Sequence, residues 1–108
     1  MECLKRVRKR AGRCYELAGR VMLYEPGADG FTLVHGHLCP QVKVDPHRAY
    51  AHAWIELPNG TIYDPVLDQY IPVAVYAASW GAVAEARYTQ KKAVTLMTGR
   101  GDFGPWHA

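Results

Sequence analysis

The stretch AHAWIELPNGTIYDP, residues 51–65, decides the fold of this 108-residue chain. Pro58-Asn59-Gly60 at its centre is a strong turn signal, because Asn and Gly adopt the backbone angles that tight hairpins need. Residues 50–57 and 61–66 on either side contain the aromatic and β-branched residues that are typical of strands. The stretch therefore predicts an antiparallel hairpin.

The length of the hairpin loop decides which side chains meet. With a three-residue loop over 58–60, Trp54 opposes Asp64, and His52 lies diagonally from Asp64 on the same face, about 7–8 Å away between backbones. With a two-residue Asn59-Gly60 loop, His52 and Asp64 would lie on opposite faces. A hydrogen bond between the imidazole and the carboxylate therefore requires the longer loop or a bulge. In that register Trp54 shares the face of His52, and we expect it to shield the bond from water.

Outward from the hairpin, apolar spacing predicts the remaining elements. We expect a helix over residues 3–24 with its firm part starting near Arg13, a strand over 31–39, and a loop over 40–47 in which a short strand over 41–44 is an alternative. Pro65 and Pro72 predict a loop or edge strand over 66–76, and the spacing after it predicts a helix over 79–97 with Gly99 as its C-cap. We expect the aromatic residues of the irregular tail, 101–106, to pack back on the core. This order predicts one α+β domain over 1–108, in which an N-terminal helix packs on a small antiparallel sheet closed by a C-terminal helix.

Composition excludes several classes of protein. Hydrophobic residues make up 49% of the chain and charged residues 21%, which is the profile of a soluble globular domain rather than a disordered or fibrous chain. No apolar run approaches the roughly 18 residues that span a bilayer, and the basic N-terminus lacks the apolar region of a signal peptide. Three cysteines cannot all pair within one chain. We therefore expect a cytoplasmic protein that uses no cofactor.

Cys14, His52 and Asp64 form the sharpest chemical pattern. A thiol becomes a strong nucleophile when a neighbouring histidine stabilises its thiolate, and a helix N-terminus favours the thiolate further. If the firm helix begins near Arg13, Cys14 lies in its first turn, where the backbone N–H of Cys14 or Tyr15 is free to stabilise an oxyanion. The alternative is an inert thiol on the buried stripe of the helix.

The same residues carry a resemblance to a known superfamily. Cys14 opening a helix, then a strand, then AHAWIE (51–56) and GTIYDP (60–65) resemble the core of papain-like and transglutaminase-like cysteine hydrolases over about residues 12–76. The closing segment, 86–106, is similar to small bacterial and phage proteins of this type. Lasso-peptide leader peptidases are similar in size and in the order of the cysteine and the His-Ala-Trp element.

The resemblance implies a function and a role for each residue of the triad. Cys14 would be the nucleophile, His52 the general base and acid, and Asp64 the residue that orients His52. Such a triad performs acyl transfer on a peptide, isopeptide or other amide. The chain departs from papain in two respects: residues 6–13 contain no Gln to complete an oxyanion hole, and the chain is about half as long, without extended substrate-binding lobes.

A second pattern places His35, His37 and Cys39 on one face of the expected strand. Their spacing would allow a zinc site with His47 or His52 as the fourth ligand. Because structural zinc ligands usually come from turns and separate elements, we favour a strand face packed on the first helix, with histidines lining the cleft, and we expect no metal. The substrate-binding residues that we expect are Tyr15, His35, His37 and Trp54. The remaining aromatic residues, Tyr50, Tyr63, Tyr70 and Trp80, would either wall a substrate pocket or pack in the core.

The basic run over residues 5–10 supports an alternative function. It would let a non-catalytic module of the same fold bind a protein or nucleic-acid partner. The run lacks interleaved aromatic residues and the net charge is only +3, so a solvated helix face is the simpler interpretation and nucleic acid the less favoured partner. We expect a peptide or amide substrate, no membrane association, and a homodimer as one oligomeric state open to so small a chain.

Overall fold

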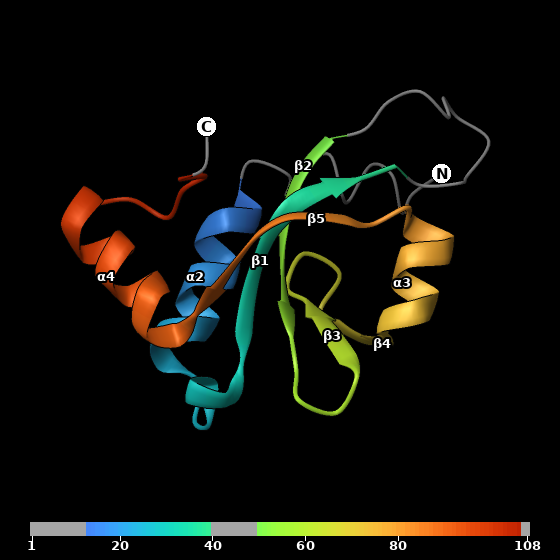
Figure 1. Ribbon diagram of the computed structural model, residues 1–108, viewed down its shortest axis with the longest axis horizontal. Coiled ribbons are helices and arrows are strands. Elements are labelled where there is room, and N and C mark those ends of the chain that lie inside the picture. Colours follow the sequence, from blue (N-terminus) through green and yellow to red (C-terminus); the bar gives the residue numbers. More distant parts are fainter. Residues whose placement is uncertain (1–12, 40–49, 107–108) are drawn as a thin grey trace.

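The computed structural model describes residues 13–39 and 50–106 and has the expected α+β architecture. Five strands form one sheet in the order β4-β3-β2-β1-β5, and every neighbouring pair is antiparallel. The strands are β1 (Thr32–Leu38), β2 (Tyr50–Glu56), β3 (Thr61–Asp64), β4 (Gln69–Pro72) and β5 (Val83–Thr89). The helices are α2 (Cys14–Tyr24), the short 3₁₀ helix η2 (Ala28–Gly30), α3 (Val73–Trp80) and α4 (Gln90–Arg100) (Figure 1).

The central hairpin has the register of the three-residue loop. Ile55 is paired with Tyr63, and the backbone N–H of Leu57 donates to the carbonyl of Thr61 across 2.8 Å. Gly60 has a φ of 80°, which a residue with a side chain rarely adopts, so the turn depends on this glycine. The prediction that His52 and Asp64 share a face of the hairpin is therefore confirmed.

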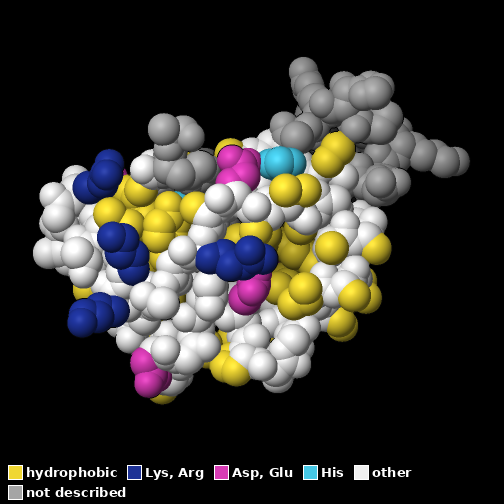
Figure 2. All heavy atoms as spheres, viewed as in Figure 1, with side chains coloured by type: hydrophobic (Ala, Val, Ile, Leu, Met, Phe, Trp, Pro, Cys, Tyr) yellow, Lys and Arg dark blue, Asp and Glu magenta, His cyan; other side chains and the backbone are white. Residues whose placement is uncertain are grey.

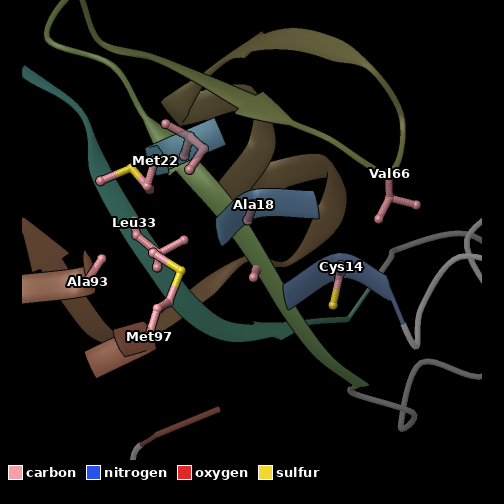
Figure 3. Close-up of a cluster of buried hydrophobic side chains, with 9 residues drawn as sticks. Cys14, Ala18, Met22, Leu33, Val66, Ala93 and Met97 are labelled. Carbon is pink, nitrogen blue, oxygen red and sulfur yellow. The ribbon is translucent and has the colours of Figure 1, made fainter. Parts of the chain in front are cut away.

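The two faces of the sheet carry separate hydrophobic clusters. On one face, α2 and α4 cover the sheet, and Figure 3 shows Cys14, Ala18 and Met22 following one another along α2. On the other face, Tyr76 of α3 packs with Trp54. The full sets of buried residues are Cys14, Ala18, Met22, Leu33, Ala53, Ile55, Val66, Ala93 and Met97 on the α2 side, and Val34, Leu38, Trp54, Ile62, Ile71 and Tyr76 on the α3 side.

The helix predicted over residues 79–97 is wrong for its first half. Residues 83–89 form β5, which pairs with the free edge of β1, and α4 starts only at Gln90, where the Thr89 hydroxyl accepts from the Lys92 N–H. The burial of β5 alternates residue by residue, as a strand requires, and pairing with β1 overrides the helix-forming tendency of its Ala, Glu and Arg residues. Gly81, with a φ of 59°, ends a helix over 73–80 that the sequence did not predict.

The other boundaries agree with the prediction except at two places. The helix expected over 3–24 is present from Cys14 onward, and β4 confirms the edge strand expected within 66–76, although Val73 already begins α3. The C-cap of α4 is Gly101 rather than Gly99, because Gly101 adopts the left-handed conformation and its N–H donates to the Met97 carbonyl. The loop over 40–47, His47 and the basic run over 5–10 lie outside the described residues.

The tail after α4 returns to the helical face of the sheet. Phe103 and Trp106 pack against the cluster on the α2 side, as predicted. Gly19 of α2 accommodates Phe103, since a Cβ at this position would lie 2.5 Å from the Phe103 ring. Within the described residues, no helix is both long enough and apolar enough to cross a membrane.

Candidate active site

Asp64 is a buried carboxylate, and each of its oxygens accepts two hydrogen bonds. Oδ1 accepts from the backbone N–H groups of Val66 (2.9 Å) and Leu67 (3.1 Å). Oδ2 accepts from His52 Nε2 (2.9 Å) and from the Tyr76 hydroxyl (2.6 Å). The turn that follows β3 supplies the two backbone donors, so the Asp-Pro sequence itself builds half of this arrangement. These four bonds occupy the acceptor positions of an ionised carboxylate.

The hydrogen bonds of Asp64 keep it ionised although it is fully buried. Burial raises the pKa of the carboxyl group, but the hydrogen bond and charge of His52, the Tyr76 hydroxyl and the Leu67 N–H lower it more, so the pKa lies below its ordinary value. Because Oδ2 is an acceptor, His52 must donate its Nε2 proton. Nδ1 is therefore the ring nitrogen of His52 that remains available for chemistry.

His52 is held as a cation at neutral pH. Burial lowers the pKa of its imidazole, but the hydrogen bond to Asp64, the thiol of Cys14 and the negative charges of both residues raise it to about 9. The ring of Trp54 stacks on that of His52 at 6.2 Å between centroids, and both side chains are almost fully buried. Trp54 therefore lies where it excludes water from the His52–Asp64 bond.

Cys14 is the first residue of α2, and its backbone N–H belongs to the free first turn of the helix. Its side chain is fully buried at the end of the cluster on the α2 side (Figure 3). The thiol of Cys14 and its charge both raise the pKa of His52, so Cys14 lies beside the imidazole. The three predicted triad residues therefore lie together, with Asp64 and Cys14 both acting on His52.

Tyr50 adds a hydroxyl group at this site. Its ring meets the His52 ring edge-on at 6.2 Å, and its buried hydroxyl has no hydrogen-bond partner within the part of the chain that the structure describes. Burial raises the pKa of Tyr50 to about 12, with further contributions from the charges of Asp64 and Cys14. The hydroxyl therefore remains protonated over the physiological pH range and is a donor in need of an acceptor.

The other residues predicted to bind substrate lie in two places. Tyr15 follows Cys14, and its ring meets buried His35 edge-on at 4.8 Å, in a cluster that also includes Tyr88 and Trp106. His37 is partly exposed, and its Nδ1 lies 2.7 Å from the Glu85 carboxylate. The structure thus places Trp54 against His52 and His35 against Tyr15. Binding of substrate by any of these residues stays a prediction.

The zinc alternative gains no support from the geometry. Among residues 13–39 and 50–106, no three His, Cys, Asp or Glu side chains are arranged to hold a metal ion. His35 packs among aromatic rings, whereas His37 Nδ1 lies 2.7 Å from the Glu85 carboxylate, so the two histidines have different neighbours. A bulge in the pairing of β1 with β5 lies between His35 and Gly36 and places Glu85 beside this end of the strand.

Sequence reasoning missed Tyr76 as part of the site. It lies in α3, where the sequence predicted a loop or edge strand, and it reaches Asp64 from twelve residues away. No local spacing marks such a contact, because a helix folded across the sheet creates it.

Compared with known proteins, this chain matches no family model, no curated protein and no solved structure.

Proposed function

We propose that the protein is a thiol-dependent acyl-transfer enzyme whose catalytic triad is Cys14, His52 and Asp64. The observation that carries the proposal is the buried hydrogen bond between His52 and Asp64 beside a thiol at a helix N-terminus. A fully hydrogen-bonded buried carboxylate that raises a histidine pKa to about 9 is a costly arrangement for a mere core contact. Perturbed ionisable groups of this kind cluster at functional sites.

The protonation states define the first step. The thiolate of Cys14, paired with the His52 cation, attacks the carbonyl carbon of an amide. A carbon–sulfur bond forms while the carbonyl electrons move to oxygen. His52 then gives its Nδ1 proton to the amide nitrogen, the carbon–nitrogen bond breaks, and a thioester with Cys14 remains.

The second step returns the enzyme to its starting state. Neutral His52 takes a proton from water or from an acceptor amine, the resulting nucleophile attacks the thioester, and the Cys14 thiolate leaves. Asp64 keeps the Nε2 proton in place throughout and stabilises the cation that forms. Because Cys14 is fully buried, the side chains around it must move before a substrate carbonyl can reach the thiol.

Residues 6–13 contain no Gln that could donate to an oxyanion beside Cys14. Tyr50 supplies this donor instead. Its buried hydroxyl has no partner among the described residues, its ring meets the His52 ring edge-on, and the charges of Asp64 and Cys14 both act on it. A hydroxyl group held near the reacting carbon, together with the N–H of Cys14, would stabilise the negative oxygen of the tetrahedral intermediate. Tyrosine thus takes the place of an amide side chain.

Acylation by an activated ester tests the proposal directly. We expect p-nitrophenyl acetate to acetylate Cys14, with the site identified by peptide mass spectrometry, and to do so far more slowly in His52→Ala. Tyr50→Phe should slow acetylation by about 10²- to 10³-fold, the effect of losing one oxyanion donor. The same variant should leave alkylation by iodoacetamide unchanged, because that displacement forms no oxyanion. Acetylation of lysines alone, or equal loss of both reactions in Tyr50→Phe, would argue against these roles.

A further inference from the structure

A cavity of about 620 Å³ lies away from the triad, between the C-terminal end of α2 and the hairpin of β2 and β3. In Figure 1 both of these elements lie at the lower end of the molecule. The walls are mainly apolar, and volumes of about 300–1,000 Å³ are typical of sites for small ligands. The lining residues are Val21, Glu25, Phe31, Ile55, Leu57, Pro58, Asn59, Tyr63, Asp68 and Tyr70.

The charges at the cavity are all negative. Glu25 and Asp68 contribute carboxylates, and none of the described residues that line it is Lys or Arg. Glu25 is the C-cap of α2, whose last turn contains no basic residue. The carbonyl end of a helix carries a partial negative charge, so this helix end adds to the field of the two carboxylates.

Two tyrosine rings form an aromatic wall beside the carboxylates. Tyr63 and Tyr70 lie 4.9 Å apart between ring centroids, and the Tyr63 hydroxyl donates to Asp68 Oδ1. The pKa of Tyr63 is raised, first by burial and then by Asp68, Tyr70 and Glu25, so both carboxylates act on the same wall. Rings of this kind attract a cation placed over their faces.

We infer that this cavity binds a small organic cation, meaning an apolar or aromatic body that carries one ammonium or guanidinium group. The apolar body would pack on Phe31 and Leu57, and the charged group would lie between Glu25 and Asp68. An anion would meet two carboxylates and a helix C-terminus, and a neutral ligand would gain only the apolar contacts. The inference does not depend on the proposed acyl transfer, since no triad residue lines the cavity.

Three probes that share a phenyl ring on a four-carbon chain and differ in their terminal group test the inference: 4-phenylbutylamine, 4-phenylbutanol and 4-phenylbutyrate. We expect the amine to bind most tightly in a titration followed by ¹H–¹⁵N NMR at low salt, with amide shifts at the end of α2 and in the β2–β3 hairpin. The alcohol should bind about tenfold more weakly and the carboxylate more weakly still. Salt should reduce the advantage of the amine, because exposed charges are screened.

Conservative variants separate charge from shape. Glu25→Gln and Asp68→Asn should each weaken amine binding about two- to fivefold, the range for one exposed ion pair, while leaving alcohol binding unchanged. Asp68 has a φ of 53°, which Asn also adopts readily, so this variant keeps the local backbone. Glu16→Gln, on the same helix but outside the cavity, and Cys14→Ala should bind the amine as the unmodified protein does.

Several outcomes would overturn the inference. These are equal affinities for the amine and the alcohol, a double variant of Glu25 and Asp68 that keeps full amine binding, and the absence of binding by any probe up to its solubility limit. Loss of amine binding in Cys14→Ala would also refute it, because the site would then belong to the triad. Failure of acetylation at Cys14 has no bearing on this result, so the two proposals fail separately.

Discussion

Replacing Asp64 by Asn removes the negative charge from the centre of the site with little change in shape. The amide oxygen can still accept from the backbone donors of Val66 and Leu67, but the amide NH₂ cannot accept the His52 Nε2 proton. The hydrogen bond and charge that hold His52 as a cation are therefore lost, while the burial that disfavours the cation remains.

The size of the effect follows from the pKa of His52. Asp64 and Cys14 together raise it from 6.5 to about 9, a difference of about 2.5 units that corresponds to on the order of 3 kcal/mol. A hydrogen-bonded opposite charge shifts a pKa by about 1–3 units. We expect the pKa of His52 in Asp64→Asn to fall from about 9 to ~7 or below.

The assay is an NMR titration of the His52 ring carbon and proton, with His52 assigned by its loss in His52→Ala. Asp29→Asn is a matched control, because Asp29 is an exposed carboxylate outside the site. Its titration of His52 should equal that of the unmodified protein. A His52 midpoint near 6.5 before any substitution, or a midpoint unchanged in Asp64→Asn, would refute the reasoning.

The same pair predicts how stability depends on pH. The folded pKa of His52 is raised, so its stabilising contribution is complete below about pH 6.5 and is lost as pH rises through about 9. The folded pKa of Asp64 is lowered, so its contribution is complete above its unfolded value of 3.8 and is lost as pH falls through the lower folded value. Urea unfolding should therefore give a maximum between about pH 4 and 6.5 and a decline above it, which Asp64→Asn abolishes. A profile that is flat between pH 6.5 and 9 would contradict the coupling.

Two further substitutions test the packing around the site. Tyr76→Phe removes a buried donor to Asp64 and should lower the free energy of unfolding by about 1.5–3 kcal/mol. Tyr70→Phe, on an exposed ring, should change it by less than about 0.5 kcal/mol. Equal effects of the two variants in urea titrations would count against the role of Tyr76. Gly36→Ala would place a Cβ 2.1 Å from the Val83 carbonyl oxygen and should cost about 1–3 kcal/mol, while Gly99→Ala, in open space on α4, should stabilise by up to about 1 kcal/mol. Thermal unfolding that ranks the two alanine variants in the opposite order would refute this packing.

The surface over α3 contains exposed apolar side chains. Figure 2 shows hydrophobic side chains gathered on the side where α3 and β4 lie, and α3 itself contains no charged residue. Val73 and Val75 are among its exposed apolar side chains. A helix that is apolar all round gives no amphipathic rhythm, which explains why the sequence did not reveal it.

The parts of the fold that could be predicted depend on local signals. The Pro-Asn-Gly turn and the alternation around it define the hairpin register, and the register brings His52 to Asp64. Residues 83–89 could not be predicted as a strand, because Ala, Glu and Arg favour a helix and only the free edge of β1 makes them extended. Tyr76 was missed as a site component for a similar reason, since its contact with Asp64 joins α3 to the end of β3.

The rate of Cys14 alkylation by iodoacetamide as a function of pH tests the central claim most directly. The measurement uses Cys3→Ser and Cys39→Ser so that one thiol reports, and it compares proteins with and without His52→Ala. The pH dependence reports ionisation, while the absolute rate reports access to a buried thiol. An activated pair predicts alkylation that persists well below about pH 8.5, the ordinary value of a free thiol, and that is lost at those pH values in His52→Ala. Identical profiles that both follow an ordinary thiol, or no reaction at any pH at which the protein is folded, would show that Cys14 is a core residue and contradict the triad.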